Sequence, residues 1–189
     1  MIFDTTPSQT VGPYFAIGLP WPEGPYAVAE GTSGAITIAG TVYDGAGVPV
    51  PDHLIETWQP DPEGRFADLC GHGGASEMPG FRGFARVGAE VGDGSFEILT
   101  VKPGRCNEPG GRPQAPHIDV SVFARGMLNR CVTRIYFADE EQANAEDPIL
   151  ARIPPDRRQT LIARPGNDGS SYRFDIRLQG PGETVFFAI

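Results

Sequence analysis

Apolar and polar residues alternate along much of this chain from residue 35 onward. Ile36, Ile38 and Val42 alternate with Thr37 and Thr41, which is the two-residue period of a strand. Similar alternation, or short β-branched and aromatic runs, predicts further strands at residues 54–58, 94–101, 118–123, 133–137, 172–178 and 185–187. Strands therefore outnumber helices, and the pattern predicts a mainly β protein with the architecture of a β-sandwich.

Two short helices complete the predicted elements. The first follows Asp139, which is a candidate N-cap residue, and it ends at Pro148. The second starts at the paired prolines 154–155 and runs from Asp156 to about Ala163. We therefore expect one β-sandwich domain over residues 35–189 with two short helices.

The first 34 residues have a different character. They carry too many glycines and prolines for a regular element. They also carry the apolar residues Val11, Tyr14, Phe15, Ile17, Leu19 and Trp21. An apolar but irregular arm must lie on a surface, so we expect residues 1–34 to pack either on their own domain or on a partner subunit.

Charge and composition exclude several classes of function. The net charge is −9 and no cluster of Lys and Arg is present, which argues against nucleic-acid binding. No apolar run approaches the roughly 20 residues of a membrane helix, and the N-terminus lacks the features of a signal peptide, so we expect a cytoplasmic protein. Cys70, Cys106 and Cys131 form no C-x-x-C motif and are interpreted as idle thiols.

Several segments, taken in order, resemble a known family. Those of the central region are Ile38-x-Gly40-x-Val42, Gly47, Val50, Ile55-Glu56, Gly64-x-Phe66, Thr100–Gly104 and Ala115–Asp119. They resemble the signature segments of the intradiol ring-cleavage dioxygenases, although Thr57 stands where that family usually has an apolar residue. Residues 6–14, 123–126, 141–145 and 174–184 resemble the α-subunit family of protocatechuate 3,4-dioxygenases. The resemblance covers essentially the whole chain.

The resemblance implies a metal site that this chain has lost. Catalytic members hold a non-haem ferric iron with two tyrosines, whose phenolates are hard donors, and two histidines. The corresponding positions here are Phe66, Cys106, His117 and Asp119, and an arginine of the family is replaced by Gln114. Three of the four ligand types are changed, so we expect a remnant site without a metal and no cofactor in this chain.

The residues alone also leave an alternative metal site open. His117 and Asp119 are two positions apart on one strand, which places both side chains on the same face. Cys106 could complete a new set of ligands with them, or the three histidines His53, His72 and His117 could supply a 2-His-1-carboxylate set. Neither His53 nor His72 has ligand spacing, so we expect His117 and Asp119 to be hydrogen-bonded remnants.

The resemblance also implies a role beside a partner. In that family the arm of the α subunit reaches the ferric iron site of the β subunit and helps to line the substrate pocket. Thr10, Gly12, Pro13 and Tyr14 would be the lining residues, and the Arg125 guanidinium would face the substrate carboxylate. The alternatives are plain packing for Tyr14 and a surface ion pair for Arg125.

The expected function follows from this role. Within a large α/β hetero-oligomer, the chain would support the cleavage of protocatechuate by O2 to 3-carboxy-cis,cis-muconate, and it would be inactive alone. A self-sufficient dioxygenase is disfavoured by Phe66, Cys106 and Asp119. A stand-alone β-sandwich carrier is the other alternative, and it would not need the arm. Arg130 and Arg134 are expected to be solvated or interfacial.

Overall fold

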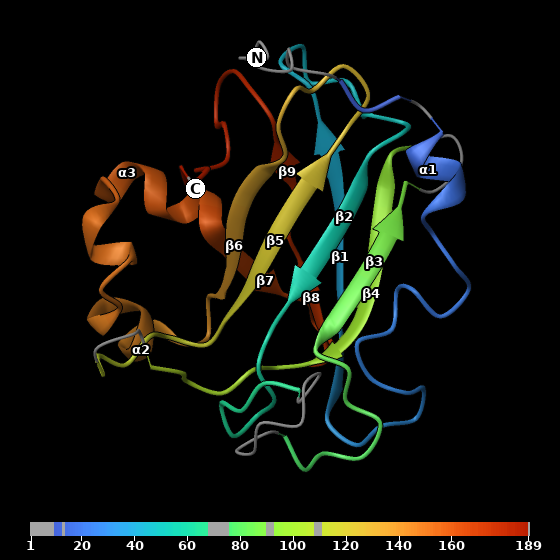
Figure 1. Ribbon diagram of the computed structural model, residues 1–189. Helices are drawn as coiled ribbons and strands as arrows, with labels where there is room; N and C mark the ends of the chain where they lie inside the picture. The colour runs from blue at the N-terminus through green and yellow to red at the C-terminus, as the bar shows by residue number, and fades with distance from the viewer. Residues whose placement is uncertain (1–9, 13, 68–75, 90–92, 108–110, 189) are drawn as a thin grey trace, which may run out of the picture.

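The computed structural model describes residues 10–12, 14–67, 76–89, 93–107 and 111–188. Two layers of strands pack face to face, with β2, β3, β5 and β6 in one layer and β1, β4, β8 and β9 in the other (Figure 1). The strands are β1 (Ala35–Tyr43), β2 (Leu54–Trp58), β3 (Phe84–Gly88), β4 (Ser95–Val101), β5 (His117–Phe123), β6 (Cys131–Phe137), β7 (Ile162–Pro165), β8 (Ser171–Arg173) and β9 (Ile176–Arg177). The predicted mainly β sandwich is confirmed.

Strand β7 joins the two layers. The hydrogen-bonded order is β3-β2-β5-β6-β7-β8-β1-β4, and β9 pairs with β1. β7 runs parallel to β6, with Tyr136 opposite Ile162, and antiparallel to β8, with Arg164 opposite Arg173. The sheet therefore curls around the core rather than remaining as two separate sheets.

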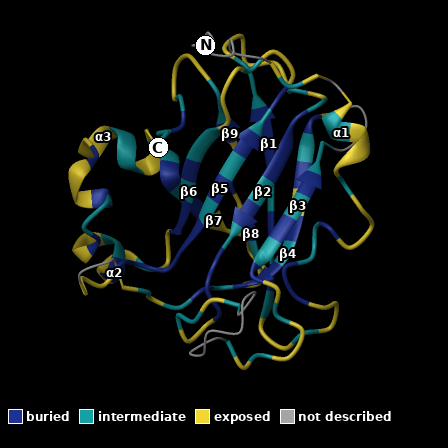
Figure 2. Ribbon diagram, viewed as in Figure 1, coloured by how far each residue is buried: buried dark blue, intermediate teal, exposed yellow. Residues whose placement is uncertain are grey.

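The core lies between the layers, where the inward face of each strand is buried (Figure 2). Ile38 and Ile98 come from one layer, and Val120 and Ile135 come from the other. A second apolar cluster lies beneath the helical segment and consists of Ala115, Tyr136, Ala143, Leu150, Ile153 and Leu161. Alternation in the sequence thus translates directly into burial.

Several strands differ from the pattern. The strand expected at 172–178 divides into β8 and β9, and residues 185–187 form only one bridge, between Val132 and Phe187. β3 and β7 were not predicted. Both are short, and β7 directly follows a helical segment, so neither stands out as a separate run in the sequence.

The first predicted helix exists, but its N-cap was wrong. α2 (Glu141–Glu146) starts after Glu140, and no side chain caps it. The Asp139 carboxylate instead accepts hydrogen bonds from Lys102 Nζ at 2.8 Å and from the Tyr172 hydroxyl at 2.9 Å. The stronger charged partner wins over the backbone N–H groups.

The second predicted helix is shorter than expected. α3 (Pro155–Arg158) starts at the paired prolines and continues only as the 3-10 turn η2 (Gln159–Leu161) before β7 begins. A further 3-10 turn, η1 (Leu150–Arg152), lies between α2 and α3. α1 (Phe15–Gly18) is an additional single turn in the arm. No helix of the described residues has the length and apolar character needed to cross a membrane.

The arm divides into two parts. Ala27 is fully buried, and its backbone bonds to Leu99 of β4 and to Arg82. By contrast, the side chains of Tyr14 and Ile17 are 78% and 77% exposed. The second half of the arm therefore lies on its own domain, while the turn of α1 presents apolar side chains to solvent.

Candidate functional site

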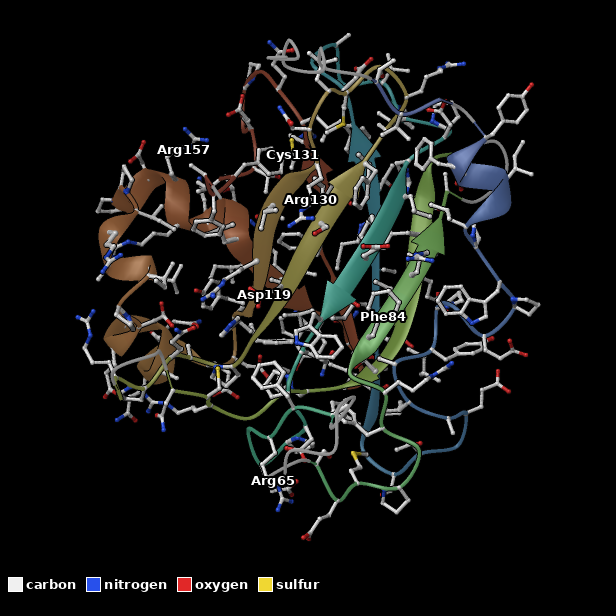
Figure 3. All side chains as sticks on the ribbon, viewed as in Figure 1. Arg65, Phe84, Asp119, Arg130, Cys131 and Arg157 are labelled. Carbon is white, nitrogen blue, oxygen red and sulfur yellow. The ribbon has the colours of Figure 1, made fainter. Side chains whose placement is uncertain are left out.

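The five remnant positions gather at one end of the sandwich. β2 and β5 are antiparallel, which sets Trp58 opposite Asp119. The ring of Phe66 stacks on Trp58 with centroids 6.1 Å apart. The carbonyl of Cys106 accepts a hydrogen bond of 2.7 Å from the backbone N–H of Gln114, just before β5. His117 and Asp119 are the first and third residues of β5. Figure 3 labels Asp119 on this strand.

The guanidinium of Arg134, from β6, lies among these positions. Its Nε donates to Asp119 Oδ1 at 2.8 Å, and its Nη1 donates to Gln114 Oε1 at 2.8 Å. Nη1 also reaches the hydroxyl of Tyr136 at 3.4 Å. The side chain is only 19% exposed, so Arg134 is not a solvated residue.

Beyond Arg134, the polar network continues inward to Asp147. This carboxylate is fully buried, and its Oδ1 accepts hydrogen bonds from the backbone N–H groups of Ile149 and Leu150, each at 2.8 Å. Its Oδ2 accepts from Ala115 N at 2.8 Å, and Tyr136 donates to Oδ1 at 3.3 Å. Burial raises the pKa of Tyr136 far above its usual range, so the phenol remains a hydrogen-bond donor.

His117 is held as a neutral ring. Its Nδ1 lies 2.7 Å from the carbonyl of Ala115, which can only accept, so Nδ1 carries the proton. Burial lowers the pKa of His117, and the nearby charge of Arg134 lowers this pKa further. The ring also packs 5.6 Å from that of Tyr136. These contacts hold His117 as a hydrogen-bonded, buried side chain.

A ferric ion does not fit this set of side chains. Phe66 offers no donor atom, and burial raises the pKa of the Cys106 thiol, which therefore remains protonated. Asp119 is engaged by Arg134, whose positive charge would repel a metal ion. In the described part of the chain, no group of three His, Cys, Asp or Glu side chains could hold a metal.

Among the described residues, the alternative site with His53 is not assembled either. His53 precedes β2, at the end of that strand remote from Asp119, and its ring is buried against Phe96. His72 lies outside the described residues, as does Cys70. Cys106 and Cys131 are free thiols.

Backbone contacts hold the loops that carry Phe66 and Cys106. Gly104 N donates to the carbonyl of Asp61 at 2.8 Å. A Cβ at Gly104 would collide with the carbonyl of Pro62, and one at Gly64, where φ is +80°, would collide with the carbonyl of Arg105. Only glycine permits this approach, so backbone contacts hold the two loops together.

The residues expected to serve a partner's site lie at the other end of β5. Thr10 Oγ1 donates to the carbonyl of Met127 at 3.3 Å, which ties the arm to the β5–β6 loop. Arg125, in that loop, is 62% exposed and forms an ion pair of 3.1 Å with Asp52. Gly12 and the exposed Tyr14 precede α1, and Pro13 lies outside the described residues. The length of β5, roughly 20 Å, separates this group from the remnant positions.

Sequence reasoning missed Arg134, Tyr136 and Asp147. Arg134 and Tyr136 are two positions apart, which places both on the same face of β6. A polar pair with this spacing, on the strand next to the one carrying His117 and Asp119, was the available signal. Asp147 had no such signal, because its partners Ala115, Tyr136 and Ile149–Leu150 come from three different segments.

Comparisons with known proteins agree with this geometry. The family model described as dioxygenase matches residues 11–180. The chain is 43% identical to the protocatechuate 3,4-dioxygenase alpha chain of Pseudomonas putida, covering 96% of this chain and 95% of the relative. It is 45% identical to the alpha chain of Burkholderia cepacia, covering 97% of each.

A solved structure shows the same fold. The dioxygenase domain of a dioxygenase carbohydrate-binding fusion from Streptomyces sp. SirexAA-E superposes with a TM-score of 0.58 at 29% identity, covering 94% of this chain and all of that one. The fold of this solved structure and the sequences of the two alpha chains therefore indicate the same family. The chain therefore belongs to the intradiol dioxygenase family, in the group formed by the protocatechuate 3,4-dioxygenase alpha chains.

Proposed function

We propose that this chain is the non-iron-binding subunit of a protocatechuate 3,4-dioxygenase and acts with a β chain that holds the ferric iron. The observation that carries the proposal is the pairing of Arg134 with Asp119 at the end of the sandwich where the remnant positions gather. The chain matches two relatives over nearly their whole length, and both are named alpha chains. An alpha chain implies a second kind of chain in the same enzyme.

The arm and the β5–β6 loop are the proposed contribution of this chain to the partner's site. Thr10 lies against that loop, and the adjacent Tyr14 is largely exposed, so both are available to a neighbour. A Cβ added at Gly12 would meet no other atom within 4 Å, so the backbone there has space for a close approach. With Pro13, these residues would line the pocket for protocatechuate.

Arg125 is proposed to recognise the carboxylate of protocatechuate. Its side chain is 62% exposed and lies 3.1 Å from Asp52 Oδ2 through Nε, so a substrate carboxylate can approach the guanidinium from solvent. An exposed ion pair contributes little, about 0–1 kcal/mol, so a buried substrate carboxylate can compete for the guanidinium. Domain 35–189 would provide the scaffold, and residues 1–34 would supply the contact with the partner.

Two measurements on paired samples test this function. Iron content and protocatechuate-dependent O2 uptake are measured for the chain alone and after co-expression with a β chain. We expect an iron-free, inactive chain and an active, iron-containing complex with 3-carboxy-cis,cis-muconate as product. Stoichiometric iron and activity in the isolated chain would contradict the proposal.

Neither a stand-alone carrier nor a self-sufficient enzyme is favoured. A carrier does not account for identity above 40% to dioxygenase alpha chains over almost the entire sequence. The cytoplasm is the proposed compartment, since a reducing environment suits the unpaired thiols of Cys106 and Cys131. Fractionation of cells that express both chains would test this location.

A further inference from the structure

A basic cavity lies far from the remnant positions, on the side of the sandwich formed by β7, β8 and β9. Its volume is about 270 Å³, and its lining includes Arg164, Arg173 and Arg177 with the hydroxyl-bearing Thr160. Asp175 is the acidic residue among the lining side chains. Three positive charges and one negative charge thus meet here, in a chain whose net charge is −9.

Two of these arginines are direct cross-strand neighbours. Arg164 of β7 and Arg173 of β8 occupy paired positions of an antiparallel ladder, so their side chains leave the sheet on the same face. Like charges at such positions destabilise a sheet. Arg164 makes no ion pair or hydrogen bond through its side chain within the described residues, so its repulsion from Arg173 is reduced only by the pairing of Arg173 with Asp175.

The other charged groups are held in place without neutralising the cavity. Arg173 Nη2 pairs with Asp175 Oδ1 at 2.6 Å and also donates to Thr41 Oγ1 at 3.1 Å. Arg177 lies over the ring of Tyr43, with its Cζ 4.8 Å from the centroid. These contacts orient the guanidinium groups, yet leave a surplus of positive charge and N–H donors.

We propose that this cavity binds a small, multiply charged anion, either a phosphate group or a polycarboxylate. The volume suits a small molecule rather than a chain segment, and several guanidinium groups can each supply paired N–H donors to phosphate or carboxylate oxygens. The bound anion would offset the repulsion between Arg164 and Arg173. The proposal concerns a different face from the partner's pocket and does not rest on the proposed function.

Calorimetric titration of the full-length chain tests the site, with inorganic phosphate, citrate and acetate as probes in low-salt buffer. We expect saturable binding of phosphate and citrate at one site per chain, and weaker binding of acetate because it carries a single charge. Arg164→Ala should weaken the first two by about tenfold, the effect of losing a charge-assisted hydrogen bond. Arg152→Ala is the matched control, since Arg152 is also exposed and without a side-chain partner in the described residues.

A second variant gives an independent signature. Arg164→Glu would form an ion pair with Arg173, so it should raise the melting temperature in buffer without phosphate or citrate. It should also remove the rise in melting temperature that phosphate causes in the unchanged chain. The proposal is overturned if either Arg164 variant binds phosphate as the unchanged chain does, or if Arg152→Ala weakens binding equally. If sodium chloride at the same ionic strength raises the melting temperature as much as phosphate does, the proposal is also overturned.

Discussion

Arg134 and Asp119 sit opposite one another on β6 and β5, and their side chains meet with Nε 2.8 Å from Oδ1. A cation supplied by the chain itself thus lies among the positions that hold a metal in catalytic relatives. The guanidinium gives the polar groups of Gln114 and Asp119 a permanent partner. These positions have therefore lost metal ligands and in addition hold the guanidinium group of Arg134.

Removal of this arginine should destabilise the fold. Arg134→Met keeps most of the side-chain volume but leaves Asp119 and Gln114 without their donor, so we expect a loss of about 1–3 kcal/mol in the free energy of unfolding. Urea denaturation measures the loss. Arg152→Met, an exposed control, should change stability by no more than about 0.5 kcal/mol. Equal stability of both variants would show that the Arg134 network is not stabilising.

The buried carboxylate of Asp147 should matter more. Asp147→Ala leaves the N–H groups of Ala115, Ile149 and Leu150 without an acceptor in the interior, so we expect a cost of about 3 kcal/mol or more. Asp147→Asn retains one oxygen acceptor and should cost less. Thermal and urea unfolding compare the two variants, and an alanine variant as stable as the asparagine variant would contradict this account.

Stability should depend on pH through His53. Burial lowers the pKa of His53 below its ordinary 6.5, against a smaller opposing effect of Asp52, and its Nε2 has no hydrogen-bond partner. Below pH 6.5 the unfolded chain therefore binds a proton that the folded chain resists. The contribution to stability is complete above pH 6.5 and is lost as the pH falls toward the lowered pKa.

Denaturation at a series of pH values checks this sign. His53→Gln should flatten the slope of stability against pH just below 6.5, whatever its effect at neutral pH. His117 shares the lowered pKa, so a residual slope in that variant should fall further when His117→Gln is added. A slope unchanged by either replacement would contradict the assignment.

The proposed contact of Arg125 with substrate predicts a selective kinetic defect. In the complex with a β chain, Arg125→Ala should raise KM for protocatechuate by about tenfold or more, since a charge-assisted contact is lost. The KM for catechol, which has no carboxylate, should change little. Arg130→Ala is the control, because Arg130 is an exposed residue of the same loop.

Oxygen uptake with both substrates decides the outcome. If Arg125→Ala raises KM for both substrates equally, or if Arg130→Ala matches it, Arg125 does not read the carboxylate. Loss of the exposed Asp52 ion pair should have little effect on folding, so both variants should form the complex normally.

The limits of prediction from sequence follow from the physics of each element. β2 was predicted with its observed bounds because its apolar run is flanked by turn residues. The gathering of Phe66, Cys106, Gln114, His117 and Asp119 was also expected, but through resemblance. The position of Arg134 at that end of the sandwich was not expected. A charged residue on a strand is predicted to be solvated unless its partners across the sheet are known.

Asp139 illustrates the opposite error. Local sequence favoured an N-cap, but Lys102, which is 37 positions away, provides a stronger partner. Rules based on local sequence consider only hydrogen-bond partners that are close in the chain. They therefore miss a partner that is distant in sequence, such as Lys102. The interior role of Asp147 was hidden for the same reason.

The glycine contacts between the loops at Gly64 and Gly104 have an evolutionary consequence. Because the backbone of each loop contacts the backbone of the other, the loops are held by more than the side chains at 66 and 106. Mutations at those two positions could then remove catalysis without unfolding the chain. A duplicated gene would in this way retain a sound scaffold while its product was free to specialise as a companion to the active copy.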